Sequence, residues 1–247
     1  MARELTSPGG KPSRRPADYW ARIRDTWRHR GLMGLGWRIV VKCVSPLGSL
    51  LLANLYERDL TQPIAPVRAK VEVTLAQATP ADADALAVLT ARADGLGSDR
   101  IPSVADEITR RFERGNLCFV ARIGPQIVHY NWVSLGWQNS LAGRFIVLPD
   151  DAAYCGGAST DEAWRGKAIH PAVHAMILRH LQTKGFRRAY TFAPFDNRPA
   201  WITVERMGWA RSGVMMAFTP RWQARTRIWR VRGRLEPFVE VELPTVA

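Results

Sequence analysis

Cysteine is scarce in this chain of 247 residues. The three cysteines, Cys43, Cys118 and Cys155, are odd in number and far apart, so the sequence predicts neither a disulfide framework nor a cysteine pair that binds zinc. The first thirty residues are polar and rich in arginine, and they contain no apolar run followed by a small-residue cleavage site. We therefore expect a cytoplasmic protein in a reducing compartment.

Long hydrophobic runs are also missing. In the most hydrophobic stretch, which begins at Gly31, the longest uncharged run is Cys43–Tyr56 with 14 residues, whereas about 20 are needed for a helix to span a bilayer. Basic residues flank the apolar ones from residue 20 to residue 60, and two interpretations fit that pattern. These residues could form helices that pack on the body of the protein, or they could lie peripherally at the inner face of the membrane, attracted by anionic lipid.

Acidic residues are too few to balance the basic ones. The chain has 35 Lys and Arg against 22 Asp and Glu, a net charge of +13 at pH 7, and the excess is densest at its ends. This charge favours anionic partners through long-range attraction. Charge and composition divide the chain into a disordered basic arm (1–18), a basic amphipathic helical extension (19–66), a folded domain (67–220) and a basic C-terminal extension (221–247).

Strand and helix patterns alternate through the folded domain. Hydrophobic alternation predicts strands, two of which form a hairpin, and periodic segments closed by glycine predict helices. The fold class is therefore α+β, a sheet with helices on its faces. The expected strands are residues 71–75, 117–123, 127–135, 144–149, 152–159, 189–193 and 209–218, and the expected helices are residues 79–93, 104–114, 167–184 and 198–207.

The loop at residues 164–169 has the composition of an anion cradle. Proline is tolerated in a helix only within the first turn, so Pro171 places a helix N-terminus at this loop. Unpaired backbone amides and the positive end of the helix dipole meet there, which suits phosphate. A plain glycine turn that opens a buried helix is the alternative. Two small residues and two basic residues complete the cradle, namely Gly166, Ala168, Arg165 and Lys167.

This loop resembles the pyrophosphate loop of the GCN5-related N-acetyltransferase (GNAT) superfamily, which is usually written Gln/Arg-x-x-Gly-x-Gly/Ala. Gly166 and Ala168 fill the two small positions of that pattern. Ala163 stands at the first position, a departure that removes one expected polar contact.

A second block, in the same order and spacing, also resembles that superfamily. The segment Asn197-x-x-Ala200, followed by Glu205–Trp209, is similar to the family's Asn-x-x-Ala…Glu-Lys-Leu-Gly-Phe helix. The resemblance covers about residues 71–218. It implies a mixed, mostly antiparallel sheet with helices on both faces, splayed between its fourth and fifth strands, and it leaves the helical N-terminal extension unexplained.

The resemblance implies an acyl-CoA-dependent N-acyltransferase, in the first place an acetyltransferase. The acyl group of acetyl-CoA or a longer acyl-CoA would pass, without a metal, to an amine that attacks the thioester directly. The amine would belong to a small-molecule or lipid-like acceptor. The strand at residues 154–159 would offer backbone amides to the thioester oxygen as it gains charge. The coenzyme-binding residues implied are Ala158, Ser159, Arg165, Gly166, Lys167, Ala168, Ile169 and Asn197.

The residues that transfer protons are less defined. The family's usual acid, a tyrosine, would fall at Val204, which has no proton to give. Candidate catalytic residues on strands near the cleft are His129 first, because it titrates in the right range, and then Tyr130, Tyr154 and Cys155. Strand alternation turns half of such residues away from a cleft. Cys155 could accept the acyl group as a nucleophile or be a buried inert thiol.

Other chemistries have weaker support. His170 and His174 stand four residues apart, but no glutamate lies between them as in metalloprotease helices, so no metal site is expected. A nucleic-acid partner is not expected either, because no recognised reading module accompanies the arginine-rich ends. Two further functions stay open: a non-catalytic protein of this fold that binds a coenzyme or another anion, and a membrane-surface adaptor built around residues 20–60.

Overall fold

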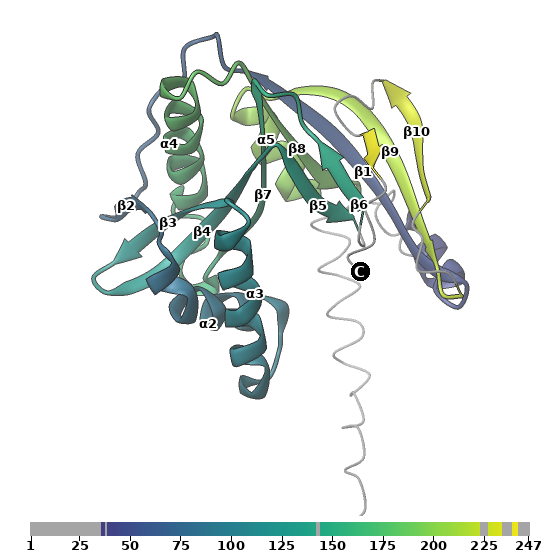
Figure 1. Ribbon diagram of the computed structural model, residues 1–247, viewed down its shortest axis with the longest axis horizontal. Helices are drawn as coiled ribbons and strands as arrows, with labels where there is room; N and C mark the ends of the chain where they lie inside the picture. The colour runs from purple at the N-terminus through teal and green to yellow at the C-terminus, as the bar shows by residue number, and fades with distance from the viewer. Residues whose placement is uncertain (1–35, 38, 142–143, 223–226, 234–238, 242–247) are drawn as a thin grey trace, which may run out of the picture.

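The computed structural model describes residues 36–37, 39–141, 144–222, 227–233 and 239–241 (Figure 1). Its strands are β1 (Gly48–Asp59), β2 (Thr74–Gln77), β3 (Leu117–Ile123), β4 (Gln126–Leu135), β5 (Trp137–Leu141), β6 (Arg144–Val147), β7 (Ala152–Thr160), β8 (Arg188–Pro194), β9 (Ala210–Pro220), β10 (Arg227–Gly233) and β11 (Val239–Val241). Its helices are α2 (Ala83–Asp94), α3 (Ile101–Glu113), α4 (Ile169–Thr183) and α5 (Arg198–Arg206), with short 3₁₀ turns at Pro80–Asp82, Ser98–Arg100 and Glu162–Trp164.

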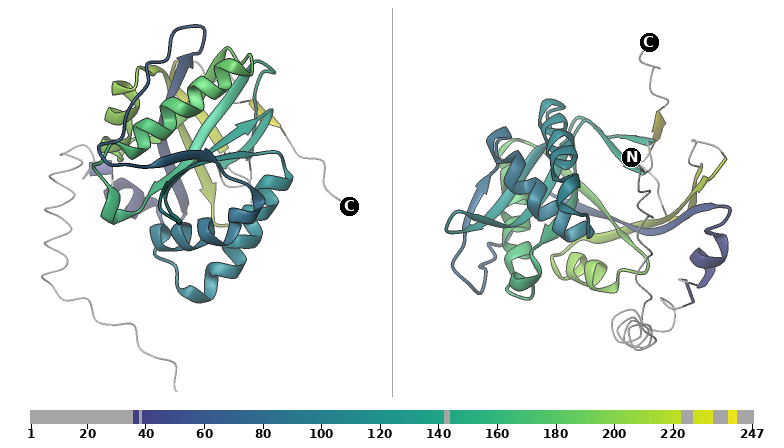
Figure 2. Two further views of the ribbon diagram at one scale, coloured as in Figure 1. Left: turned by 90° about the vertical axis from the view of Figure 1, so that its left-hand side faces the viewer. Right: turned by 90° about the horizontal axis from the view of Figure 1, so that it is seen from below.

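The strands form one large and one small sheet. The large sheet has the order β10-β9-β1-β8-β7-β4-β3-β2, and the small one has the order β11-β6-β5. Among the described strands, β7 and β8 form the only parallel pair. Helices α4 and α5 share one core with the sheet, whereas α2 and α3 pack on its other face (Figures 1 and 2). The predicted α+β class, a mixed and mostly antiparallel sheet with helices on both faces, is confirmed.

The large sheet opens between β7 and β8. These two strands pair only from Ala152 to Tyr154 and from Arg188 to Tyr190, although β7 continues to Thr160 and β8 to Pro194. Beyond the paired stretch, β7 stays bonded to β4 and β8 stays bonded to β1. Each strand therefore follows its outer neighbour, and the two halves of the sheet diverge, as the predicted splay between the fourth and fifth strands requires.

The N-terminal extension differs from the expectation. Residues 39–44 are helical, but residues 48–59, which were expected to belong to a helical extension, form β1 between β8 and β9. Leu55 and Tyr56 are fully buried. A strand covered on both faces is apolar at most positions and loses the alternation by which strands are recognised. The boundary expected at residue 67 therefore does not separate β1 from the folded domain.

The C-terminal extension also enters the sheets. β10 pairs with β9 at the edge of the large sheet, and β11 pairs with β6 in the small one. Edge strand β2 begins three residues later than the predicted strand at residues 71–75. The basic arm at residues 1–18 lies outside the described residues. None of the helices in the described part of the chain combines the length and the apolar character that a bilayer crossing requires.

The position of β1 predicts the cost of truncating its side chains. We expect Leu55→Ala to lower the free energy of unfolding by about 2–5 kcal/mol, because it leaves a cavity in a fully buried strand. Leu47→Ala, one residue before β1 and 54% exposed, should change it by less than about 0.5 kcal/mol. Urea unfolding followed by circular dichroism measures both. Equally small effects would contradict the burial of β1.

Candidate functional site

The N-terminus of α4 has free backbone amides. Its N-cap residue, Ala168, has a φ of 57°, and Gly166 has a φ of 76°. Within the described part of the chain, no backbone carbonyl or side chain accepts a hydrogen bond from the amides of residues 166–170. The first amides of a helix have no intrahelical acceptor, so these groups converge on the space in front of α4. The predicted helix start before Pro171 is present, and the amides around it are open.

This helix start is unfavourable without a ligand. An alanine N-cap offers no side-chain oxygen, and the loss of such a cap typically costs about 1 kcal/mol. Ala168 also has a positive φ, the only one among the described residues other than glycine, and that conformation costs an L-residue about 1–2 kcal/mol. Strain of this kind persists where the fold imposes it and is concentrated at functional sites. An anion bound to the free amides would supply the missing cap.

A cavity of about 310 Å³ lies in front of these amides. Its lining includes Arg165, Gly166, Ala168 and Ile169 of the predicted cradle, and also Lys70. The amide of Lys70 donates to the carbonyl of Lys167 at 2.8 Å, which holds the chain before β2 against the loop. Lys70 and Arg165 bring positive charge to the cavity, and no carboxylate is among its lining residues. Sequence analysis did not identify Lys70, because only tertiary structure brings it to a loop almost one hundred residues away.

A second hollow continues from the cradle. This groove, about 530 Å³, lies between α4, α5 and the chain at residues 63–67, and it shares Pro171 and Thr203 with the cradle cavity. Its walls are mostly apolar, with Arg58 and Arg206 as its charged residues. The cradle and the α4/α5 groove therefore form one continuous surface that combines free amides, positive charge and apolar walls.

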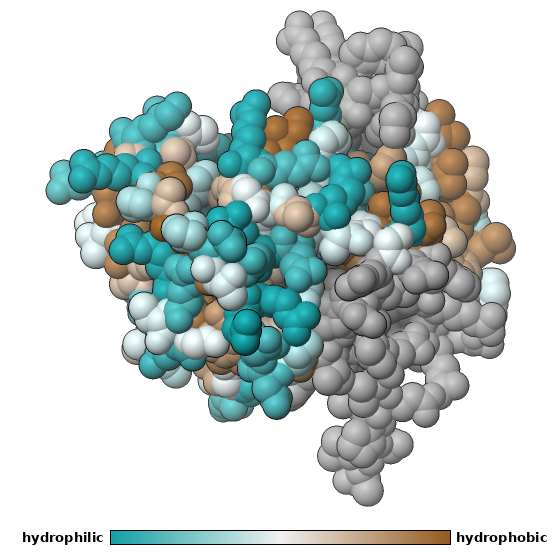
Figure 3. Space-filling view, turned by 90° about the horizontal axis from the view of Figure 1, so that it is seen from above, coloured by the Kyte–Doolittle hydropathy of each residue, from teal (hydrophilic) through white to brown (hydrophobic). Residues whose placement is uncertain are grey.

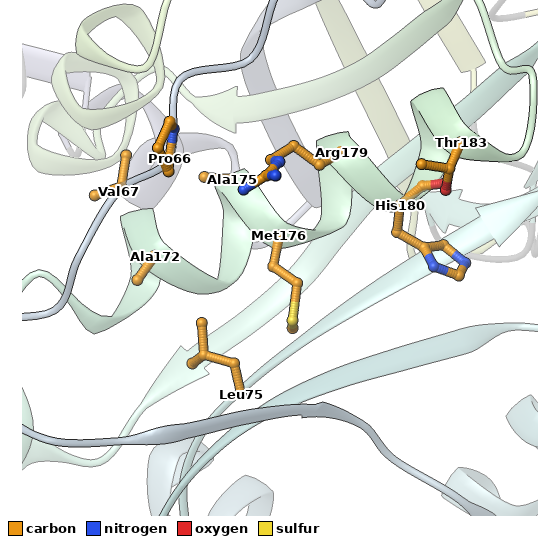
Figure 4. Close-up of a pocket in the computed structure, with 9 residues that line it drawn as sticks. All are labelled: Pro66, Val67, Leu75, Ala172, Ala175, Met176, Arg179, His180 and Thr183. Carbon is orange, nitrogen blue, oxygen red and sulfur yellow. The ribbon is translucent and has the colours of Figure 1, made fainter.

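A third hollow is separate from the cradle. It has a volume of about 410 Å³ and lies on the outer side of α4, where Met176 points toward Leu75 of β2 and the chain at Pro66 and Val67 passes alongside (Figure 4). It shares no lining residue with the cradle cavity. Its lining is mostly apolar, so we assign the anion site to the cradle.

Strand β7 has a bulge beside the opening of the sheet. Tyr130 pairs with Ser159, but Trp132 pairs with Gly156, so two residues of β7 face one residue of β4. One of the extra residues is Gly157, with a φ of 65°, and the other is Ala158. Bulged residues leave the strand ladder, which frees backbone groups for other partners. The predicted amide donors at residues 154–159 therefore include an irregular stretch.

Asn197, like Lys167, is not among the residues that line the cradle cavity. Asn197 is exposed at the start of α5, where its side-chain oxygen accepts a hydrogen bond from the amide of Ala200 at 3.3 Å. It follows the end of β8, as the cradle follows the end of β7. The α4 and α5 N-termini thus lie beyond the same ends of two parallel strands, the usual position of ligands in sheets that contain parallel strands.

Two predicted catalytic residues lie in the core. Cys155 is 1% exposed beneath α4, and burial raises the pKa of its thiol to about 12. Tyr154 points to the opposite face, where its ring packs near Phe192, and burial raises its pKa well above the usual range. Both groups keep their protons at neutral pH. Cys155 therefore has the properties of an inert thiol rather than of a nucleophile, and Val204 is buried in the same core.

His129 lies in a cluster of three imidazoles, of which His129 and His174 are buried and His170 is half-buried. His129 is fully buried, its Nδ1 lies 2.7 Å from the hydroxyl of Thr160, and its Nε2 lies 3.4 Å from Nδ1 of His170. The ring of His174 follows that of His170, and its Nδ1 lies 3.2 Å from the amide of Asn131. Burial lowers the pKa of His170 to about 4 and, together with the charge of His170, that of His174 to about 3.

The cluster is therefore neutral at physiological pH. The pKa of His129 is also held well below its ordinary value, first by burial and then by the neighbouring imidazoles. Thr160 and His170 line the cradle cavity, and His129 contacts both, so the cluster joins α4 to β4 and β7 beside the cradle. Among the described residues, no group of three or more His, Cys, Asp or Glu side chains has the arrangement of a metal site.

The sequence matches no protein-family model and no curated protein. Among solved structures, a GCN5-related N-acetyltransferase from Sphaerobacter thermophilus is similar to 73% of this chain, with 14% identity and a TM-score of 0.51. A GNAT-family acetyltransferase from Colwellia psychrerythraea is similar to 81% (14% identity, TM-score 0.49), and a functionally unknown protein from Staphylococcus epidermidis to 71% (14% identity, TM-score 0.48). The match spans 56%, 62% and 64% of those proteins' own lengths. At this identity the first comparison establishes the fold, which is that of the GCN5-related N-acetyltransferases.

The neutral histidine cluster predicts a loss of stability in mild acid. In the unfolded chain these imidazoles titrate near pH 6.5, so the unfolded state binds more protons than the folded state as the pH falls from about 6.5 to about 4. Stability present at pH 7 is lost across that window at about 1.4 kcal/mol per histidine for each pH unit, so that on the order of 2 kcal/mol per histidine is lost by pH 5. Urea unfolding at pH 7 and pH 5 measures it.

Variants assign that pH dependence to the cluster. His174→Leu should reduce the decrease in the free energy of unfolding between pH 7 and pH 5. His180→Gln, which changes a half-buried ring outside the cluster, should leave most of that decrease unchanged. An unchanged slope in His174→Leu would show that the cluster is charged in the folded protein.

Proposed function

We propose that this chain, which has the GNAT fold, is an acyl-CoA-dependent N-acyltransferase. The carrying observation is the free amides at the start of α4, which face a positively charged cavity beside the opening between β7 and β8. A coenzyme A thioester has a diphosphate for such a cradle and a long polar arm for the opening. Acetyl-CoA is the first donor to test, and a longer acyl-CoA is the second.

In this proposal the protein holds the coenzyme at its nucleotide end and at its thioester end. The amides of residues 166–170 bind the diphosphate, and Lys70 and Arg165 neutralise its charge. The adjoining α4/α5 groove offers apolar walls to the rest of the nucleotide. The pantetheine arm enters between the diverging ends of β7 and β8, past Asn197, and brings the thioester to the β7 bulge.

The reaction is direct transfer to an amine of a small-molecule or lipid-like acceptor. The amine nitrogen forms a bond to the thioester carbon, and the bond between that carbon and sulfur breaks. Backbone amides of the bulge stabilise the charge that develops on the carbonyl oxygen. The nitrogen gives up a proton, and the thiolate takes one. Because Val204 has no proton to give, we propose water as the proton donor to the thiolate, in place of a side chain at that position.

His129 has no open path to the thioester in this arrangement. Its ring is fully buried, and both of its nitrogens lie close to a neighbouring group. A neutral amine can attack without a base, because its proton becomes acidic only as the new bond forms. The protein therefore contributes position and backbone dipoles, and His129 supports the cradle through Thr160.

The second candidate is a non-catalytic protein that binds a coenzyme or another anion in the same cradle. It is favoured by Val204 at the position of the acid and by Ala163 at the first position of the loop. Release of free coenzyme A thiol, measured with a panel of amines, separates the two. Turnover with any amine rejects the non-catalytic function, and coenzyme binding without turnover across the panel supports it.

Substitution in the cradle tests the binding site. We expect Gly166→Leu to weaken coenzyme A binding at least 100-fold in isothermal titration calorimetry. The leucine side chain would occupy the cradle, and the backbone at residue 166 would abandon the positive φ that keeps the amides exposed. Gly185→Leu is the matched control. Gly185 also has a positive φ, 83°, and open space around it, but it lies at the other end of α4. Equal affinity in Gly166→Leu and the unchanged protein would reject the cradle.

The pH dependence of turnover tests the absence of a histidine base. We expect kcat/KM to rise with pH along the titration of the acceptor amine, because only the neutral amine attacks. With an amine of lower pKa, the profile should move to lower pH by the difference between the pKa values of the two amines. His129→Gln should keep that profile. A profile that breaks near pH 6.5 for every amine, and disappears in His129→Gln, would instead make His129 the base.

A further inference from the structure

Two segments of the chain contain no acidic residue. Residues 26–56 carry four basic residues, and residues 206–235 carry eight arginines, with no Asp or Glu in either segment. The fold brings them together, because β1 in the first segment pairs along its length with β9 in the second, and β10 adds to β9. In the large sheet, β9, β10 and β1 as far as Tyr56 thus contain no acidic residue, and the acidic residues of β1, Glu57 and Asp59, lie at its far end.

The two segments meet where β1 begins and β9 ends. Gly48 pairs with Pro220, and the amide of Arg221 donates to the carbonyl of Leu47 at 3.0 Å. The helical residues 39–44 come just before this point. We call this end of the sheet the basic tip, and define it by Ile39, Val40, Lys42, Leu47, Arg221 and Trp222.

Large apolar side chains are exposed on the basic tip. Ile39 is 58% exposed, Leu47 is 54% exposed and Trp222 is 67% exposed, and Val40 is exposed beside them. Lys42 and Arg221, which belong to the same end of the sheet, are also exposed. In Figure 3 hydrophobic surface gathers at the right-hand edge, the side on which Figure 1 places β1, β9 and β10. Exposed apolar residues that gather in one place, with charged residues around them, mark a surface that binds a partner.

The chemistry of the basic tip favours a lipid bilayer over other anionic partners. Nucleic acid is bound mainly by positive and polar groups, which would leave Ile39, Val40 and Leu47 without a use. A bilayer with anionic lipids uses both kinds of group, because apolar side chains and tryptophan enter the interface while Lys and Arg meet the headgroups. The absence of acidic residues from both segments removes the repulsion that such a surface would otherwise meet.

We infer that the basic tip docks this protein on the surface of membranes that contain anionic lipids. Ile39, Leu47 and Trp222 enter the headgroup region, and Lys42 and Arg221 contact the lipid phosphates. Val231 is also exposed, on edge strand β10 of the same sheet. This inference does not depend on acyl transfer, and it is tested without any coenzyme.

Co-sedimentation with lipid vesicles tests the docking. The full-length protein should sediment with vesicles of phosphatidylcholine and phosphatidylglycerol, at about 0.1 M salt, and not with phosphatidylcholine alone. Lys42→Gln with Arg221→Gln should weaken the partition roughly 25-fold, since each basic residue near the surface contributes about fivefold. Leu47→Glu with Trp222→Glu should weaken it at least tenfold, because these changes remove inserted side chains and add repulsion.

Matched controls come from exposed apolar residues elsewhere. Val88 and Leu96 are each 42% exposed, in α2 and just after it, so Val88→Glu with Leu96→Glu makes the same chemical change away from the basic tip. This control should sediment with vesicles as the unchanged protein does. Thermal unfolding by circular dichroism checks that every variant is folded. Because all of the substituted side chains are exposed, we expect changes of less than about 0.5 kcal/mol in stability.

Three results would overturn the inference. The first is equal sedimentation with neutral and anionic vesicles, or none with either. The second is a control variant that loses as much binding as the tip variants. The third is a different partner for the same residues. This would be a DNA duplex that binds more tightly than vesicles in fluorescence anisotropy, or a dimer in sedimentation velocity, provided that Leu47→Glu with Trp222→Glu abolishes the interaction.

Discussion

The candidate site depends on a helix that begins without a cap at the place where the sheet opens. Helix α4 follows β7, and the amides of residues 166–170 have no acceptor in the described part of the chain. Ala168 supplies no capping oxygen and holds a left-handed conformation. The eight buried residues of α4 offset this local cost, so the helix stays in place and its amides stay available to an anion.

The strands around the opening keep it open. β7 remains bonded to β4, and β8 remains bonded to β1, so the gap between them does not close by pairing. The N-terminal strand is therefore part of the frame of the site. The chain that follows it is also fixed to α4, since the side-chain amide of Gln182 donates to the carbonyls of Leu60 and Gln62. That path ends at Lys70, beside the cradle.

Positive charge is used in two different settings. In the cradle, Lys70 and Arg165 reinforce backbone amides, while the imidazoles beside it remain neutral because burial disfavours their charged form. At the basic tip, Lys42 and Arg221 are exposed, as are large apolar side chains. Two basic residues thus line the cavity to which we assign an anion, and two others stand on the surface that we infer to dock on a bilayer.

Local sequence determined the elements whose signals are local. Pro171 and Gly166 fixed the start of α4, and alternation fixed the hairpin of β3 and β4, because turns, caps and strand periodicity act over a few residues. Only the tertiary structure decided that residues 48–59 form a strand, that Lys70 reaches the cradle and that His129 is sealed in the core. Those outcomes depend on which distant segments pack against a residue, and the sequence of one segment does not determine which other segments will pack against it.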